Sequence, residues 1–269
     1  MTGSPLARSP RRRRPAVTPL GMAAALTVVL ATVLSTAACG PSTQNSSGSD
    51  LSSSSSPGST SADGAHTEQT TYLIDQTVAK LTLDGRSGRV TVTAADGPIS
   101  VTEAFTYSDD KPATSHTVSG DGLALEETGC QHERAINGRC EVAWDIKAPA
   151  ATVVTLSTKA GGVAVTGMSG AIDAKTNAGG IRGRALVAKS VSAKTNAGGV
   201  DLKFNQPPDQ VQATSNAGGI DIQVPAGTSY AVQADSNTGH PDVEVSQADN
   251  STHKIQARTN AGGIDISNG

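Results

Sequence analysis

Four acidic residues recur at one position of a repeated segment, each directly after a Val or an Ile: Asp201, Asp221, Glu244 and Asp265. If the repeats stack in parallel, these carboxylates would lie near 5 Å apart on an outward face. Like charges at that spacing repel unless they are screened or bridged. A divalent cation such as Ca²⁺, which takes oxygen ligands, could bridge them. The alternative is a solvated acidic stripe that keeps the surface soluble and discourages sideways aggregation. The solvated stripe is the favoured interpretation, and a cation or ligand stripe at these four residues is the functional candidate; no cofactor other than Ca²⁺ is considered.

Catalytic motifs are missing from the sequence. No G-x-S-x-G occurs, because GRSGR (85–89) and GMSGA (167–171) miss the spacing. The histidines are scattered, without an H-x-x-x-H pair of the zinc-binding type. Glu126 and Glu127 are adjacent on a strand-like segment, so they point to opposite faces and make a poor acid and base pair. The sequence predicts a protein that is not an enzyme.

Two cysteines, Cys130 and Cys140, bracket a segment that contains the turn signal Asn137-Gly138. In an exported protein this arrangement predicts a disulfide across the base of the turn. A metal site made of Cys130, His132 and Cys140 is the alternative, but it lacks a clear fourth ligand.

The chain contains six versions of one unit between residues 152 and 266. They are VTLSTKAGGVAV (154–165), IDAKTNAGGIRG (172–183), VSAKTNAGGVDL (191–202), VQATSNAGGIDI (211–222), VQADSNTGHPDVEV (232–245) and IQARTNAGGIDI (255–266). A repeat of about 20 residues is typical of a solenoid or stacked array. Within each unit apolar residues alternate with polar ones, which predicts two short strands with one buried face. The Gly-Gly between them fits a corner, because glycine adopts positive φ at little steric cost.

One column of the aligned units is filled by asparagine, which favours parallel stacking over antiparallel hairpins. Amides that repeat at strand spacing satisfy one another's hydrogen bonds, and hairpins need no such column. The predicted fold is all-β, a parallel β-solenoid with a less regular N-terminal β part; a twisted antiparallel sheet or sandwich is the alternative. The predicted structural ladder consists of Asn177, Asn196, Asn216, Asn237 and Asn260.

The N-terminal region has the order of an exported precursor. Residues 1–38 combine five arginines with a fourteen-residue apolar run, 21–34, too short to span a bilayer, which predicts a signal peptide. Cys39 follows Thr36-Ala37-Ala38 and resembles the acylated cysteine of a bacterial lipoprotein lipobox, although that motif usually has Leu where Thr36 stands. Residues 39–71 are rich in Ser, Thr and Gly and predict a lipidated cysteine followed by a disordered tether. The folded domain is predicted to be 72–269, with an irregular part at 72–150 and the repeats at 151–269.

The charge of the mature chain excludes a basic footprint for nucleic acid. The chain has 21 Lys and Arg, of which five lie in residues 1–38, so 16 remain against 24 Asp and Glu. With few aromatic residues, the core must be built from Val, Ile, Leu, Ala and Thr, which suits a narrow enclosed section.

Several segments resemble a family of bacterial adhesin-like domains of uncharacterised function with β-helix-like repeats. They are LTLDGRSGRVTVTA (81–94), WDIKAPAATVVTLSTKAGGVAVTGMSGAIDAKTNAGGI (144–181) and IDIQVPAG (220–227). The resemblance brings no catalytic residues. It implies a binding or structural module on a lipid-anchored protein at the extracytoplasmic side of the cell membrane, facing an envelope polymer or a surface protein. A polysaccharide-acting enzyme on a β-helix scaffold is the alternative, by fold-level analogy.

The chain ends three residues after its last repeat, without a polar capping segment. We therefore expect the final coil to expose an unpaired strand edge, through which the chain could self-associate or accept a partner strand.

Overall fold

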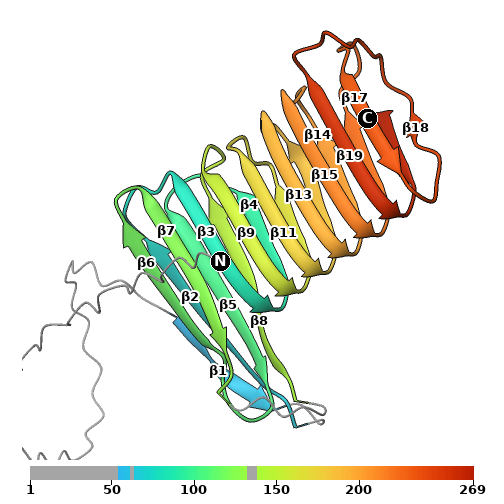
Figure 1. The fold of residues 1–269 in the computed structure, drawn as a ribbon. Coiled ribbons are helices and arrows are strands. Elements are labelled where there is room, and N and C mark those ends of the chain that lie inside the picture. The colour runs from blue at the N-terminus through green and yellow to red at the C-terminus, as the bar shows by residue number, and fades with distance from the viewer. Residues whose placement is uncertain (1–53, 61–63, 132–137) are drawn as a thin grey trace, which may run out of the picture. The chain divides into compact units, whose positions relative to one another are not determined.

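The computed structural model describes residues 54–60, 64–131 and 138–269, which form strands, turns and loops in two sheets (Figure 1). The predicted signal peptide and Cys39 lie outside these residues. Over the described ranges, no helix is long and apolar enough to cross a membrane.

Sheet A has eleven strands. In spatial order they are β1 (Ser54–Thr60), β2 (His66–Ile74), β5 (Ile99–Tyr107), β8 (Cys140–Ala148), β4 (Val90–Ala94), β10 (Val163–Thr166), β12 (Ile181–Leu186), β14 (Val200–Phe204), β16 (Ile220–Val224), β20 (Ile264–Asn268) and β18 (Asp242–Val243). Sheet B has nine: β17 (Ala231–Ser236), β19 (Lys254–Ala261), β15 (Gln210–Ala217), β13 (Ser190–Ala197), β11 (Ile172–Ala178), β9 (Val153–Ala160), β3 (Lys80–Ser87), β7 (Gly122–Gly129) and β6 (Ala113–Ser119).

The repeats form the predicted parallel solenoid. Each coil gives one strand to each sheet, and equivalent residues of successive coils pair directly, as Thr176 does with Thr195. Antiparallel pairing, the alternative for the whole domain, is confined to the N-terminal part, where β1, β2, β5 and β8 pair in this way and β6 pairs with β7.

The core is a narrow stack of small apolar side chains between the sheets. In sheet B, Ile172, Val191, Val211 and Ile255 lie one above another and are all nearly inaccessible. The adjacent inward column is alanine, which lets the two sheets approach closely. Trp144 is also buried, on β8, where the antiparallel part of sheet A meets the parallel part.

Each Gly-Gly is an architectural corner between a strand of sheet B and a strand of sheet A. The first glycine has a positive φ, 145° at Gly198, and a Cβ placed there would come within 2.2 Å of the carbonyl oxygen of Gly179 in the neighbouring coil. Just before the corner, a buried hydroxyl donates to that neighbouring glycine carbonyl, as Thr195 does to Gly179 at 2.8 Å. Only glycine fits this close backbone approach.

The asparagine column bonds along the stack as predicted. Asn196 donates to Asn177 at 2.5 Å, Asn260 donates to Asn216 at 2.5 Å, and Asn237 donates to Asn260 at 3.0 Å. The order of the last two bonds shows that the sixth unit lies between the fourth and the fifth.

This order corrects the expectation that the C-terminal coil ends the array. Strands β19 and β20 are paired on both sides, and the outermost strands are β17 and β18 of the fifth unit. Proline explains the arrangement. Pro241 aligns with Ile264 and Ile220, and Ile220 donates its N–H to the next coil at 2.9 Å, which proline cannot do. The fifth unit is therefore tolerated only at the end of the stack.

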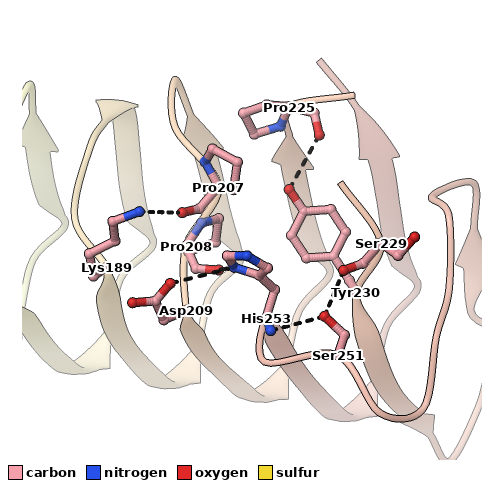
Figure 2. A network of polar contacts seen from close by, with 9 residues as sticks. All are labelled: Lys189, Pro207, Pro208, Asp209, Pro225, Ser229, Tyr230, Ser251 and His253. Carbon is pink, nitrogen blue, oxygen red and sulfur yellow. Dashed lines mark hydrogen bonds and ion pairs between the residues drawn. The ribbon is translucent and has the colours of Figure 1, made fainter. Parts of the chain in front are cut away.

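A network of polar contacts holds the connections that this detour requires (Figure 2). The buried Tyr230 donates its hydroxyl to the carbonyl of Pro225 at 3.2 Å and lies edge-on to His253, with ring centroids 5.9 Å apart. Nδ1 of His253 lies 2.7 Å from the carbonyl oxygen of Pro208, and Ser251 donates to the carbonyl of Ser229 at 2.7 Å. These contacts join the loops before β15, β17 and β19.

The N-terminal boundary of the domain lies earlier than predicted. Residues 66–71, assigned to the disordered tether, belong to β2, which pairs with β5 along its whole length, and residues 54–60 form β1 at its edge. The threonines of β2 are half-buried and Gln69 is exposed, so this edge pairs through its backbone and needs little apolar surface. The predicted disulfide between Cys130 and Cys140 is confirmed, with Cα atoms 6.1 Å apart; His132 of the alternative metal site lies outside the described residues.

Candidate binding groove

A groove of about 800 Å³ runs along the outside of the stacked corners. Five coils contribute to it in the same way. Its lining includes the second glycine of each corner and the first outward-facing residue of each sheet A strand: Gly162, Gly180, Gly199, Gly219 and Gly263, with Ala164, Arg182, Asp201, Asp221 and Asp265, and with Arg89 also present. Because glycine has no side chain, the corner backbone itself is open to the groove.

Three of the four predicted acidic residues line this groove, and the fourth does not belong to the column. Asp201 pairs in register with Asp221, and Asp221 with Asp265. The residue paired with Asp265 on β18 is Asp242, whereas Glu244 lies two residues further along. The prediction for Glu244 is wrong because the irregular corner of the fifth unit shifts its sequence alignment. Counting from Pro241, which aligns with the other coils' first sheet A residue, would have identified Asp242.

Arg184 binds Asp201, the first carboxylate of the acidic column, a contact that the sequence did not reveal. Its guanidinium binds both carboxylate oxygens of Asp201, with Nη1 2.5 Å from Oδ1, and Nε of Arg182 lies 3.7 Å from Oδ2. The pairing of β12 with β14 shifts register between Gly183 and Leu186. Within this bulge Ala185 has a φ of 51°, the one positive φ of a non-glycine residue in the described chain. Bulges re-aim side chains, and this one brings Arg184 against Asp201.

The pKa values of the neighbouring carboxylates Asp201 and Asp221 are shifted in opposite directions. The Arg184 guanidinium lowers the pKa of Asp201 below its ordinary value, by a hydrogen bond first and charge attraction second. Burial raises the pKa of Asp221, and the charges of Asp201 and Asp265 raise it further. Oδ1 of Asp221 is buried and makes no hydrogen bond to any described residue. Asp221 is therefore the carboxylate whose bonding capacity the fold leaves unused.

A cation cluster is not formed by the column. Among the residues whose positions the structure gives, no group of three or more His, Cys, Asp or Glu side chains could hold a metal ion. Parallel strands hold these carboxylates in a row at about 4.8 Å, and the first is already neutralised by Arg184. The stripe is thus better described as one wall of a groove than as a cage for Ca²⁺.

The pair Glu126 and Glu127 divides as the strand pattern predicts, with Glu126 exposed and Glu127 buried. Oε2 of Glu127 accepts the backbone N–H of Arg86 at 2.7 Å and that of Ser87 at 3.3 Å. Burial nevertheless raises the pKa of Glu127. This carboxylate anchors the first corner of the stack and lies apart from the groove's lining.

Comparison with known proteins agrees with this architecture. Residues 142–267 match the model of the Toastrack DUF4097 family. The matched range includes all six repeats and all the groove-lining residues except Arg89. No curated protein matches the chain.

Solved structures are similar to this chain at low sequence identity, and the first of those described next shares its fold. A "putative cell adhesion protein" from Clostridium sporogenes has a TM-score of 0.50 and 13% identity, with 76% of this chain and 100% of that chain covered. A "putative adhesin" from Bacteroides fragilis has a TM-score of 0.44 and 14% identity, and the match covers 74% of this chain and 96% of that chain. Another from Parabacteroides distasonis has a TM-score of 0.40 and 11% identity, covering 73% and 96%.

Proposed function

We propose that this protein is a non-catalytic, adhesin-like binding module that uses the groove along its corners to hold an extended polymer of the cell envelope or a surface protein. The observation that carries the proposal is the groove itself, to which five successive coils contribute the same positions, with a glycine in every coil and an aspartate in three of them. A site whose positions repeat at a fixed interval along the stack suits a ligand that is itself long and repetitive. The adhesin names of the structural neighbours agree with such a role.

We further propose that the module is a lipoprotein. Removal of residues 1–38 would leave Cys39 as the acylated N-terminus, anchored in the cell membrane and facing the extracytoplasmic side. Metabolic labelling with a radioactive fatty acid tests this: the wild-type chain should take up label and Cys39→Ser should not. Equal labelling of the variant would contradict the anchor.

The groove can be filled without disturbing the fold, which gives the binding proposal a sharp test. A Cβ added at Gly263 meets no heavy atom within 4 Å, and its φ lies outside the glycine-only range. Gly263→Trp should place an indole in the groove. Gln212→Trp, at an exposed position on the opposite sheet, adds the same side chain elsewhere. We expect purified full chain to bind isolated envelope, Gly263→Trp to lose at least tenfold in affinity, and Gln212→Trp to match the wild type.

One observation favours a second candidate, a glycan-cleaving enzyme. Neighbouring carboxylates with pKa values displaced in opposite directions, as at Asp201 and Asp221, are typical of acid and base pairs. Against it, both oxygens of Asp201 are engaged by Arg184, which removes the nucleophile or base that such a pair requires. We expect no release of reducing ends from cell-wall polysaccharides. Activity lost on Asp221→Ala would favour the enzyme instead.

A further inference from the structure

The corners that shape the groove also expose a row of backbone donors. At each corner a hydroxyl of the next coil donates to the carbonyl of the first glycine, at 2.8 to 2.9 Å. The five bonds are Thr176 to Gly161, Thr195 to Gly179, Ser215 to Gly198, Thr259 to Gly218 and Ser236 to Gly262. Four of these hydroxyl residues are almost wholly buried, and each glycine carbonyl points toward the neighbouring coil that holds its donor.

Peptide geometry then fixes the direction of the following N–H. In a trans peptide the C=O of one residue and the N–H of the next point in opposite directions. Because the carbonyl of Gly179 points toward Thr195 and Gly198 of the next coil, the N–H of Gly180 points away from that coil. The same holds for the second glycine of each of the five corners: Gly162, Gly180, Gly199, Gly219 and Gly263. These N–H groups make no hydrogen bond to any described residue, and all five glycines line the groove.

The result is a straight row of donors at the spacing of adjacent strands, about 4.8 Å. The parallel wall of Asp201, Asp221 and Asp265 supplies acceptors. A matching ligand must therefore accept hydrogen bonds from one side and donate them to the other.

Three polymer classes can be compared by this criterion. A polyanion would accept from the N–H row but would be repelled by Asp221 and Asp265. A polycation would favour the carboxylates but has nothing to accept from the amides. An extended peptide presents like-directed groups about 6.8 Å apart, twice its rise per residue, and falls out of register with the donors. A hydroxyl both donates and accepts, so a chain of neutral sugars satisfies both walls at once.

We propose that the groove binds a neutral, hydroxyl-rich polysaccharide, whose oxygens accept from the amides of the second glycines and whose hydroxyls donate to Asp221 and Asp265. This inference rests on the proposed binding function and names the ligand class for the same groove. Asp221 supplies an acceptor because it lines the groove and its carboxylate is not bound by an arginine as Asp201 is, although its buried Oδ1 is out of a ligand's reach.

The corners carry their own internal control for a test. The first glycines bond their N–H groups to the next coil, Gly179 to Ala197 at 2.8 Å, Gly198 to Ala217 at 2.9 Å and Gly218 to Ala261 at 2.7 Å. In a full chain labelled with ¹⁵N-glycine, titration with neutral hexasaccharides of glucose, mannose and galactose should shift the amide signals of Gly180, Gly199 and Gly219. The signals of the first glycines should move much less.

Variants and matched probes complete the experiment. For the hexasaccharide that binds, Gly263→Trp should weaken affinity at least tenfold and Asp221→Asn about tenfold, because a charge-assisted hydrogen bond is replaced by a neutral one. A hexauronate should bind more weakly than its neutral counterpart.

The outcomes distinguish a wrong ligand class from a groove that has no binding function. If no neutral hexasaccharide binds, or binding leaves the second-glycine amides unshifted, the ligand class is wrong. If envelope binding is still lost on Gly263→Trp, the groove function survives that result. Preferential binding of the hexauronate, or of an extended hexapeptide, would also overturn the inference and would identify the other class.

Discussion

Replacing Gly198 by alanine should disrupt the stack at one defined point. Its φ of 145° lies in a region that residues other than glycine rarely adopt, so holding alanine there costs roughly 1–3 kcal/mol. The added Cβ would also lie 2.2 Å from the carbonyl oxygen of Gly179, so the neighbouring coil must move, at a further cost of about 1–3 kcal/mol. Together these effects predict a loss of about 3–5 kcal/mol in the free energy of unfolding.

Gly263→Ala is the matched control, because it adds the same methyl group at a corner where nothing lies within 4 Å. Denaturant unfolding of both variants should show a large loss for Gly198→Ala and a change within about 0.5 kcal/mol for Gly263→Ala. A thermal melt should show a drop of about 6–20 °C for the first alone. Equal stabilities of the two variants would refute the argument that close backbone approach dictates the first glycine.

Three further predictions concern charges and the disulfide. The fold raises the pKa of Asp221, so the stability that this residue contributes is present below its ordinary pKa and is lost as the pH rises through the folded value. Asp221→Asn should therefore be more stable than the wild type at pH 7 and equal to it at pH 3. Urea unfolding at both pH values checks this. Arg184→Ala should raise the pKa of Asp201 in an NMR carboxyl titration while costing less than about 1 kcal/mol of stability, since both side chains are partly exposed; an unmoved titration would disprove the pairing. Replacing Cys130 and Cys140 together by serine should cost about 2–3 kcal/mol, measured by unfolding with and without reductant, and wild-type stability unaffected by reductant would contradict this.

The corners, the strand alternation and the asparagine ladder follow from local sequence. Each copy of the unit contains its own turn glycine and its own hydroxyl, buried in every copy except the fifth, so the regular coils share one corner geometry. The disulfide was equally predictable, because a turn signal between two nearby cysteines leaves little choice of partner.

The order of the last coils did not follow from chain order, because stacking depends on which neighbours can complete the ladder. Asn260-Ala261-Gly262-Gly263-Ile264 matches the fourth unit closely, whereas the fifth unit carries Pro241 where a donor is needed. The clamp of Arg184 on Asp201 was hidden for a different reason: it depends on a bulge at Ala185, a residue type that gives no signal of positive φ. The early start at His66 was missed because polar edge strands lack the apolar alternation that marks buried ones.

The two glycines of the repeated Asn-Ala-Gly-Gly have different roles. The first glycine is a structural requirement of the corner, since a side chain there would collide with the neighbouring coil. The second glycine lines the groove, and its N–H makes no hydrogen bond to any described residue. One element can therefore both build the stack and present it to a ligand.

The most direct test of this account compares envelope binding by the wild-type chain, Gly263→Trp and Gln212→Trp at equal concentration. We predict binding by the wild type and Gln212→Trp, and a loss of at least tenfold for Gly263→Trp with its unfolding free energy unchanged. Full binding by a stably folded Gly263→Trp would contradict the groove as the binding surface.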